Sequence, residues 1–141
     1  MSNEQWHGEF AVETSAPANV IWGIFCDVPR WKNWNAGIEQ IELDGPFATG
    51  TWFTMKPPGQ DSLRSKLVDV RENVGFVDET RVGPLAITVA HRIEPLAAGR
   101  TRIVYAVEAN GPEAAEIGPA VASDFPDVLA ALAKLAEARS S

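Results

Sequence analysis

The sequence predicts an α+β domain in which a carboxyl-terminal helix packs on one face of a curved antiparallel sheet. Three observations favour this fold. Apolar residues recur with the helical period near the two ends of the chain, they alternate with a period of two from residue 38 to residue 109, and short turns join the strand-length segments of that stretch. Short connections are typical of antiparallel hairpins, and a run of strands followed by a helix is typical of α+β proteins.

The chain has the size and composition of a single domain, residues 1–141. It is 45% hydrophobic and 22% charged, and a chain of this length can bury about 68–70% of its unfolded surface. Cys26 is the only cysteine, which excludes an internal disulfide, and His7 and His91 are the only histidines. The sequence contains neither a glycine-rich phosphate loop nor a dinucleotide fingerprint. We therefore expect no metal site and no cofactor.

The charge and the hydropathy of the chain limit the kinds of partner that we expect. With 12 Lys and Arg against 19 Asp and Glu, the net charge of −7 argues against binding to nucleic acid, which requires clustered cations. No apolar run approaches the ~20 residues that span a bilayer, and the amino terminus does not have the pattern of a signal peptide. We expect a soluble cytoplasmic protein without stable membrane insertion, as a monomer or homodimer.

The amino-terminal segment predicts a strand followed by two short helices. Phe10 and Val12 alternate with polar neighbours, as in a half-buried strand. Apolar residues at helical spacing follow over residues 20–26. Pro29 ends that helix, and residues 29–34 have the composition of one further helical turn or a tight loop.

Six further strands are expected between residues 38 and 109. Their segments are 38–43, 52–56, 63–71, 76–81, 85–94 and 102–109. Turn residues such as Asp44-Gly45-Pro46 and Ala98-Gly99-Arg100 separate them. With the first strand, the sheet has seven strands.

The carboxyl terminus returns to the helical period. One apolar stripe is formed by Val128, Leu129, Leu132, Leu135 and Ala136. Upstream, residues 113–117 are compatible with a helix that Gly118-Pro119 should kink or break. We expect residues 113–125 to be less rigid than residues 128–138 and to open access to the interior. The alternative is that the prolines only curve the helix along the sheet.

The order of these elements and three sequence features carry a family resemblance. The features are the Trp31/Trp34 pair, the strand start Gly50-Thr51-Trp52 and residues 99–105. From Phe10 to Ala138 the chain resembles the START/Bet v 1-like (SRPBCC) superfamily, and within it bacterial polyketide cyclase/dehydrase-like proteins.

The resemblance implies a helix-grip fold. In that fold a seven-stranded antiparallel sheet wraps around a long carboxyl-terminal helix, and two short helices lie between the first and second strands. The space between sheet and helix typically holds a hydrophobic small molecule such as a lipid, sterol, quinone or polyketide. Some relatives catalyse cyclisation, dehydration or hydrolysis, and others only bind or carry their ligand.

Three residues are candidates for catalysis. Alternation along residues 85–94 places His91 on the core face, at the end of an apolar row, and the same argument turns Tyr105 inward one strand away. A partly desolvated imidazole can act as a general acid or base. Asp78 shares the parity of Phe76 and is the third candidate. The alternative is that His91 and Tyr105 are ordinary core residues with satisfied hydrogen bonds.

The neighbouring segment, residues 63–71, alternates as well. Leu67 should face the core, whereas Arg64 and Lys66 should face solvent. Asp69 has the parity of Leu67 and could be drawn inward.

The expected ligand cavity lies between the sheet and the terminal helix. Apart from the catalytic candidates, it should be lined by Phe10, Val12, Trp31, Trp34, Ile87, Val89, Ile103, Leu129 and Leu132. Trp31 and Trp34 share a helical face and are suited to the mouth of a pocket. Alternatively, they close the open end of the core.

Three functions remain open at this point. The first is binding or transport of a small hydrophobic molecule, the second is a cyclase or dehydratase that uses His91 and Tyr105, and the third is a protein-interaction module with an incidental cavity. Ionisable groups converging inside the cavity would favour the enzyme. A filled cavity with a large exposed apolar patch would favour the interaction module.

Overall fold

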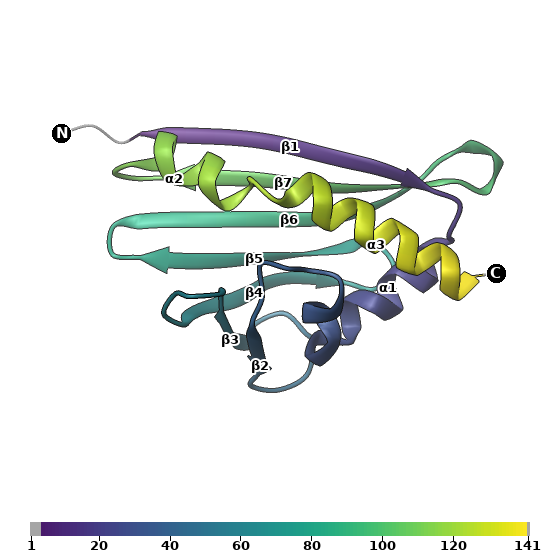
Figure 1. Cartoon of the computed structure of the whole chain (residues 1–141), viewed down its shortest axis with the longest axis horizontal. Coiled ribbons are helices and arrows are strands. Elements are labelled where there is room, and N and C mark those ends of the chain that lie inside the picture. The colour runs from purple at the N-terminus through teal and green to yellow at the C-terminus, as the bar shows by residue number, and fades with distance from the viewer. Residues whose placement is uncertain (1–3, 141) are drawn as a thin grey trace.

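A computed structural model of the chain describes residues 4–140, in which one antiparallel sheet packs its concave face against helices (Figure 1). The strands are β1 (Gln5–Thr14), β2 (Gln40–Leu43), β3 (Trp52–Lys56), β4 (Leu63–Arg71), β5 (Gly75–Val82), β6 (Leu85–Pro95) and β7 (Thr101–Asn110). The α-helices are α1 (Ala18–Cys26), α2 (Ala114–Val121) and α3 (Phe125–Ser140), and the 3-10 turns are η1 (Val28–Asn33) and η2 (Ala97–Gly99). The predicted α+β class, the seven strands and the two short helices after the first strand are confirmed.

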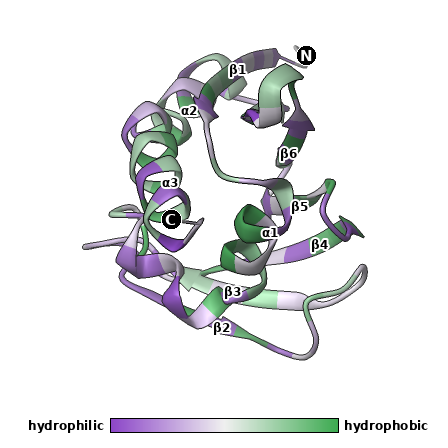
Figure 2. Cartoon of the chain, turned by 90° about the vertical axis from the view of Figure 1, so that its right-hand side faces the viewer, coloured by the Kyte–Doolittle hydropathy of each residue, from purple (hydrophilic) through white to green (hydrophobic). Residues whose placement is uncertain are grey.

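The strands lie in the order β1-β7-β6-β5-β4-β3-β2. From β2 to β7 each strand pairs with its neighbour in sequence, because the predicted turns close antiparallel hairpins. β1 instead pairs with β7, so α1 and η1 carry the chain from one edge of the sheet to the other. Figure 2 shows the strands following an arc, with α1 inside it and α2 and α3 across its open side.

Alternation along the strands separates a core face from a solvent face. On β6 every second residue is buried and the residues between them are only partly covered. The buried row ends with His91 and Ile93, as the sequence predicts. None of the helices within residues 4–140 is long and apolar enough to cross a membrane.

The core consists of two clusters of buried side chains. The larger joins α1, η1 and α3 to β3–β7, and within it the ring of Phe76 contacts those of Phe25 and Trp31. The smaller lies where α2 covers the far ends of β6 and β7. Since burying one large apolar side chain contributes roughly 1.5–3 kcal/mol, these clusters position every element that bears the site.

A β-bulge in β4 changes which side chains face the core. The pairing shifts between Leu67 and Asp69, so Val68 is the additional residue and becomes exposed. Asp69 therefore turns to the solvent side, where its carboxylate lies 3.1 Å from Nε of Arg71. The expectation that Asp69 could be drawn inward is wrong, because a bulge inverts the alternation beyond it.

The terminal helical segment is interrupted later than the sequence predicts. Pro119 lies inside α2, which continues to Val121, and the interruption spans residues 122–124. Pro119 removes only its own backbone donor, and the amide of Ala122 still donates to the carbonyl of Gly118 at 3.1 Å. Of the predicted kink or break at Gly118-Pro119, the break is wrong, because α2 continues through Pro119. Pro126 lies in the first turn of α3, where proline is tolerated.

Candidate functional site

Asp78, His91 and Tyr105 come together on the concave face of three adjacent strands. The register pairs His91 of β6 with Tyr105 of β7, and Asp78 of β5 is the cross-strand partner of Val89, two residues before His91. Nε2 of His91 lies 3.9 Å from Oδ2 of Asp78, and the ring centroids of His91 and Tyr105 are 4.5 Å apart. Their predicted inward orientation is confirmed, and no bulge intervenes in β5, β6 or β7.

His91 is enclosed by aromatic rings. Its imidazole stacks on Phe76 with centroids 4.0 Å apart at 11°, and the rings of Phe25 and Tyr105 meet it edge-on. Nδ1 lies 3.3 Å from the carbonyl oxygen of Phe76, to which a neutral ring donates its Nδ1–H. Burial lowers the pKa of His91 to about 3, so the ring is neutral at pH 7. The unprotonated Nε2 then faces Asp78.

Asp78 lies in the same apolar environment without a cationic partner. Within residues 4–140 its only ion-pair contact is His91, and its side chain is 14% exposed. Burial raises the pKa of Asp78 to about 7. The distance of 3.9 Å is too long for a hydrogen bond. At pH 7, therefore, His91 is neutral and the carboxyl group of Asp78 is about half protonated.

Tyr105 provides a neutral phenol beside this pair. Burial is the largest cause that raises its pKa, followed by the negative charges of Asp78 and Asp124. The ring of Phe125 packs edge-on against Tyr105 at 5.4 Å. Because the pKa is raised, the hydroxyl stays protonated and can donate a hydrogen bond to an oxygen atom of a ligand.

Two hydroxyl groups that the sequence analysis did not include extend the polar row. Ser65 and Thr80 are cross-strand partners on β4 and β5, and their hydroxyl oxygens are 2.6 Å apart. Thr80 follows Asp78 by two residues and shares its face. Alternation along the strands could have indicated them, since Thr80 lies on the same face of its strand as Asp78, and Ser65 on the same face as Leu67. Hydroxyl side chains are so common in strands that parity alone did not identify them.

The residues expected to line one cavity divide between the two core clusters. Ile103, Leu129 and Leu132 are buried in the larger cluster, and Phe10 and Val12 pack against it. Ile87 and Val89 belong to the smaller cluster. These residues are confirmed as interior, and the cavity itself remains a prediction.

The two tryptophans are parts of the core rather than of an exposed lid. Trp31 stacks on Phe76 at 5.5 Å, and its Nε1 donates a 2.9 Å hydrogen bond to the carbonyl oxygen of Phe25. Trp34 contacts Phe25 and Trp31 and is 8% exposed. This packing supports the alternative reading, in which both residues close the open end of the core.

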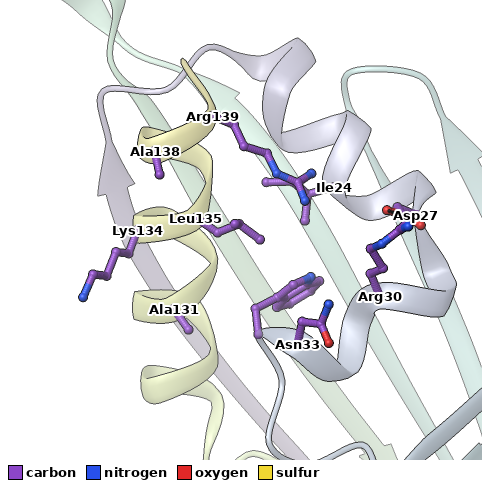
Figure 3. A pocket seen from close by; sticks show the side chains of 10 residues that line it. Ile24, Asp27, Arg30, Asn33, Ala131, Lys134, Leu135, Ala138 and Arg139 are labelled. Atoms are coloured by element: carbon purple, nitrogen blue, oxygen red, sulfur yellow. Dashed lines mark hydrogen bonds and ion pairs between the residues drawn. The ribbon is translucent and has the colours of Figure 1, made fainter. Parts of the chain in front are cut away.

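A pocket of about 380 Å³ lies between the end of α1, η1 and the second half of α3 (Figure 3). A second hollow of about 320 Å³ is lined by residues of η1, β2 and β3. Of the predicted lining residues, only Trp34 borders the larger pocket, and neither pocket touches Asp78, His91 or Tyr105. Within residues 4–140 no cluster of His, Cys, Asp and Glu could hold a metal ion.

Fold and site together define a helix-grip protein with a polar group on the concave face of its sheet. A family model described as polyketide cyclase / dehydrase and lipid transport matches residues 5–137, and the chain belongs to this family. The resemblance predicted from the sequence is confirmed. No curated protein matches the chain in sequence.

Solved structures share the fold over nearly the whole chain. The Zhui aromatase/cyclase from Streptomyces sp. R1128 is 19% identical with a TM-score of 0.83, over 98% of this chain and 97% of that chain. Norcoclaurine synthase from Thalictrum flavum, in complex with dopamine and hydroxybenzaldehyde, is 18% identical with a TM-score of 0.78, over 99% and 91%. Ara h 8.0201 is 14% identical with a TM-score of 0.75, over 96% and 99%. At these identities the likeness extends to the fold alone.

Proposed function

We propose that the protein binds a small hydrophobic molecule bearing a carbonyl or hydroxyl group against the concave face of β5, β6 and β7. The observation that carries this proposal is the buried Asp78–His91 pair, 3.9 Å apart in apolar surroundings. Within residues 4–140 every fully buried side-chain polar atom has a hydrogen-bond partner, whereas the Asp78 carboxyl keeps some accessible surface. An oxygen atom of a ligand would give this carboxyl a hydrogen-bond partner in its apolar surroundings. The family description, which covers both lipid transport and cyclase or dehydrase activity, supports binding of a hydrophobic ligand or cyclase activity.

The raised pKa of Asp78 favours a second candidate function on the same site. A carboxyl group with a pKa of about 7 both accepts and donates protons near neutral pH, as a general acid–base catalyst must. In this proposal, the Asp78 carboxylate removes a proton from the carbon next to a ligand carbonyl, and the Tyr105 hydroxyl donates a hydrogen bond to the enolate oxygen. His91 stays neutral at pH 7, so it places no positive charge beside Asp78 that would lower the pKa of the carboxyl group.

A matched pair of bicyclic probes tests the binding site. We expect 1-tetralone to shift the backbone amide resonances of Asp78, His91 and Tyr105 in ¹⁵N–¹H spectra, and tetralin, which lacks the carbonyl, to shift them much less. Tyr105→Phe should weaken tetralone binding roughly 2- to 13-fold, since a neutral hydrogen bond contributes about 0.5–1.5 kcal/mol. Equal shifts with both probes, or no shift at these residues, would contradict the proposal.

The same probe tests the chemistry. In D₂O, the protein should accelerate exchange of the protons at C2 of 1-tetralone, and Asp78→Asn should abolish this acceleration. The rate should rise with pH through about 7, because the ionised carboxylate is the base. Asp69→Asn is the matched control, since Asp69 lies on the outer face of β4. Binding without accelerated exchange would leave the protein a carrier.

A further inference from the structure

The pocket between α1, η1 and α3 is separate from the concave site and has its own chemistry. Its wall is largely apolar, with Ile24 from α1, Trp34 at the end of η1, and Ala131 and Leu135 from α3. On α3 the lining residues recur every three to four positions, so one face of the helix borders the pocket. None of the residues proposed to bind a ligand on the concave face lines it.

The rim of this pocket is positively charged. Arg30, Lys134 and Arg139 stand there against one carboxylate, Asp27. Nη1 of Arg30 lies 2.9 Å from Oδ2 of Asp27, so these two charges largely neutralise each other. Within residues 4–140 neither Lys134 nor Arg139 forms an ion pair, so no carboxylate of the described residues neutralises their charges.

The two uncompensated cations point in different directions. Figure 3 shows Arg139 reaching from α3 across the pocket toward α1, whereas Lys134 extends away from the pocket. Arg139 therefore places a guanidinium group over the apolar wall. A guanidinium group is suited to a carboxylate, which it binds through two parallel hydrogen bonds.

The charge of the rim is opposite in sign to the net charge of the chain. The chain carries a net charge of −7, which would repel an anion at long range. At physiological ionic strength, however, charges farther away than about 8 Å are largely screened. The local cations therefore determine which ligand charge is favoured at the pocket.

We propose that this pocket binds an anionic amphiphile, with its carboxylate on Arg139 and a single apolar chain against Ile24, Trp34 and Leu135. The volume of about 380 Å³ is near the lower end of the roughly 300–1,000 Å³ of small-molecule sites, which suits one chain rather than a two-chain lipid. The proposal does not depend on the concave site.

Three probes with the same ten-carbon chain test the charge preference. Decanoate, kept below the concentration at which it forms micelles, should shift the amide resonances of Ile24, Trp34 and Leu135. Decyltrimethylammonium should bind there at least about tenfold more weakly, and 1-decanol should lie between them, since an interaction with a charged group is worth about 1.5–3 kcal/mol. Similar affinity for all three probes would overturn the proposed anion preference.

Two glutamine variants on one helix test the role of the guanidinium group. Arg139→Gln should weaken decanoate binding roughly tenfold and remove most of its dependence on salt. Lys134→Gln is the matched control, which loses an equal charge from the same helix but from a side chain that points away, and it should change the affinity less than about threefold. Equal effects of the two variants would mean that decanoate senses only overall charge, and the site would be refuted.

The position of the shifts separates this proposal from the first. If decanoate shifts Asp78, His91 and Tyr105 instead of the pocket residues, the ligand occupies the concave face, and the pocket proposal fails while the proposed function stands. If tetralone shows no shift on the concave face but decanoate shifts the pocket, the reverse holds.

Discussion

Asp78 and His91 respond to burial in opposite directions. An unfolded chain ionises its aspartates near pH 3.8, but the pKa of the buried Asp78 is about 7. An unfolded chain protonates its histidines near pH 6.5, but the pKa of the buried His91 is about 3. Between about pH 4 and 6.5 the folded state therefore holds a proton on Asp78 that the unfolded state has lost, and lacks one on His91 that the unfolded state carries.

The consequences for stability have opposite signs. The raised pKa of Asp78 contributes stability that is fully present below about pH 3.8 and is lost as the pH rises through about 7. The lowered pKa of His91 contributes stability that is present above about pH 6.5 and is lost as the pH falls through about 3. The two contributions offset each other between about pH 4 and 6.5.

Single substitutions should expose each contribution. Relative to the parent protein, the free energy of unfolding of Asp78→Asn should rise with pH from about 4 to 7, and that of His91→Gln should fall from about 3 to 6.5. Each slope should be at most about 1.4 kcal/mol per pH unit. Urea unfolding across this range measures both slopes. Curves parallel to that of the parent would refute the assignment of these pKa values.

At the scale of residues, the sequence predicts a side chain's orientation only where the alternation is unbroken. His91, Tyr105 and Asp78 face inward as predicted, because β5, β6 and β7 pair without an inserted residue. The orientation of Asp69 was wrong because the bulge at Val68 depends on pairing with β5, which no pattern within β4 encodes.

At the scale of elements, α2 is held against the sheet by a close contact with one aromatic ring. A Cβ atom added at Gly118 would overlap the indole of Trp6, and one at Gly8 would meet the same ring from β1. Both glycines thus let the ring lie between α2 and β1. The contact needs the small size of these glycines.

Two equivalent substitutions separate packing from helix propensity. Gly118→Ala should destabilise the protein by about 1–3 kcal/mol, since the added methyl group must displace Trp6 or α2. In Gly23→Ala of α1, the new Cβ meets no atom within 4 Å apart from the adjacent residues and the nearby backbone of its own helix, and the change should stabilise the protein by about 0.5–1 kcal/mol. Thermal or urea unfolding of both variants measures the difference. A stabilising Gly118→Ala would contradict the close contact.

The two terminal helices also differ in what they bury. α2 buries Ala114 and Gly118, whereas α3 buries larger side chains that include Leu129 and Leu132. Because α2 buries less apolar area than α3, its local opening should cost less free energy than that of α3.

Hydrogen exchange should therefore be faster before Phe125 than after it. We expect the amides of residues 114–124 to exchange faster than those of residues 128–138, and to slow on addition of a ligand that occupies the concave face. Uniformly slow exchange from Ala114 onward would exclude this segment as the route of access. The control is β6, a central strand, whose amides should exchange slowly throughout.

At the scale of the whole molecule, the sequence predicts the class of fold better than it predicts the positions of the pockets. The strand count and hairpins follow from alternation and turn residues within each segment, and the family resemblance supplies the wrapped helix. A pocket instead depends on how side chains of distant elements fill the space between them. Arg139 and Ile24 border one pocket although they belong to opposite ends of the chain. No local sequence pattern predicts that these two residues lie close together.

The strand order has a consequence for how the chain is made. β1 is synthesised first, yet its only partner in the sheet is β7, with Gln5 opposite Asn110. As the chain leaves the ribosome, hairpins can form one after another from β2 onward, while β1 remains unpaired until β7 has emerged. A strand whose backbone groups stay unpaired for so long can associate with other chains. Glu9 and Glu13 on its outer face place two negative charges on that strand, and charged side chains on an unpaired strand oppose such association.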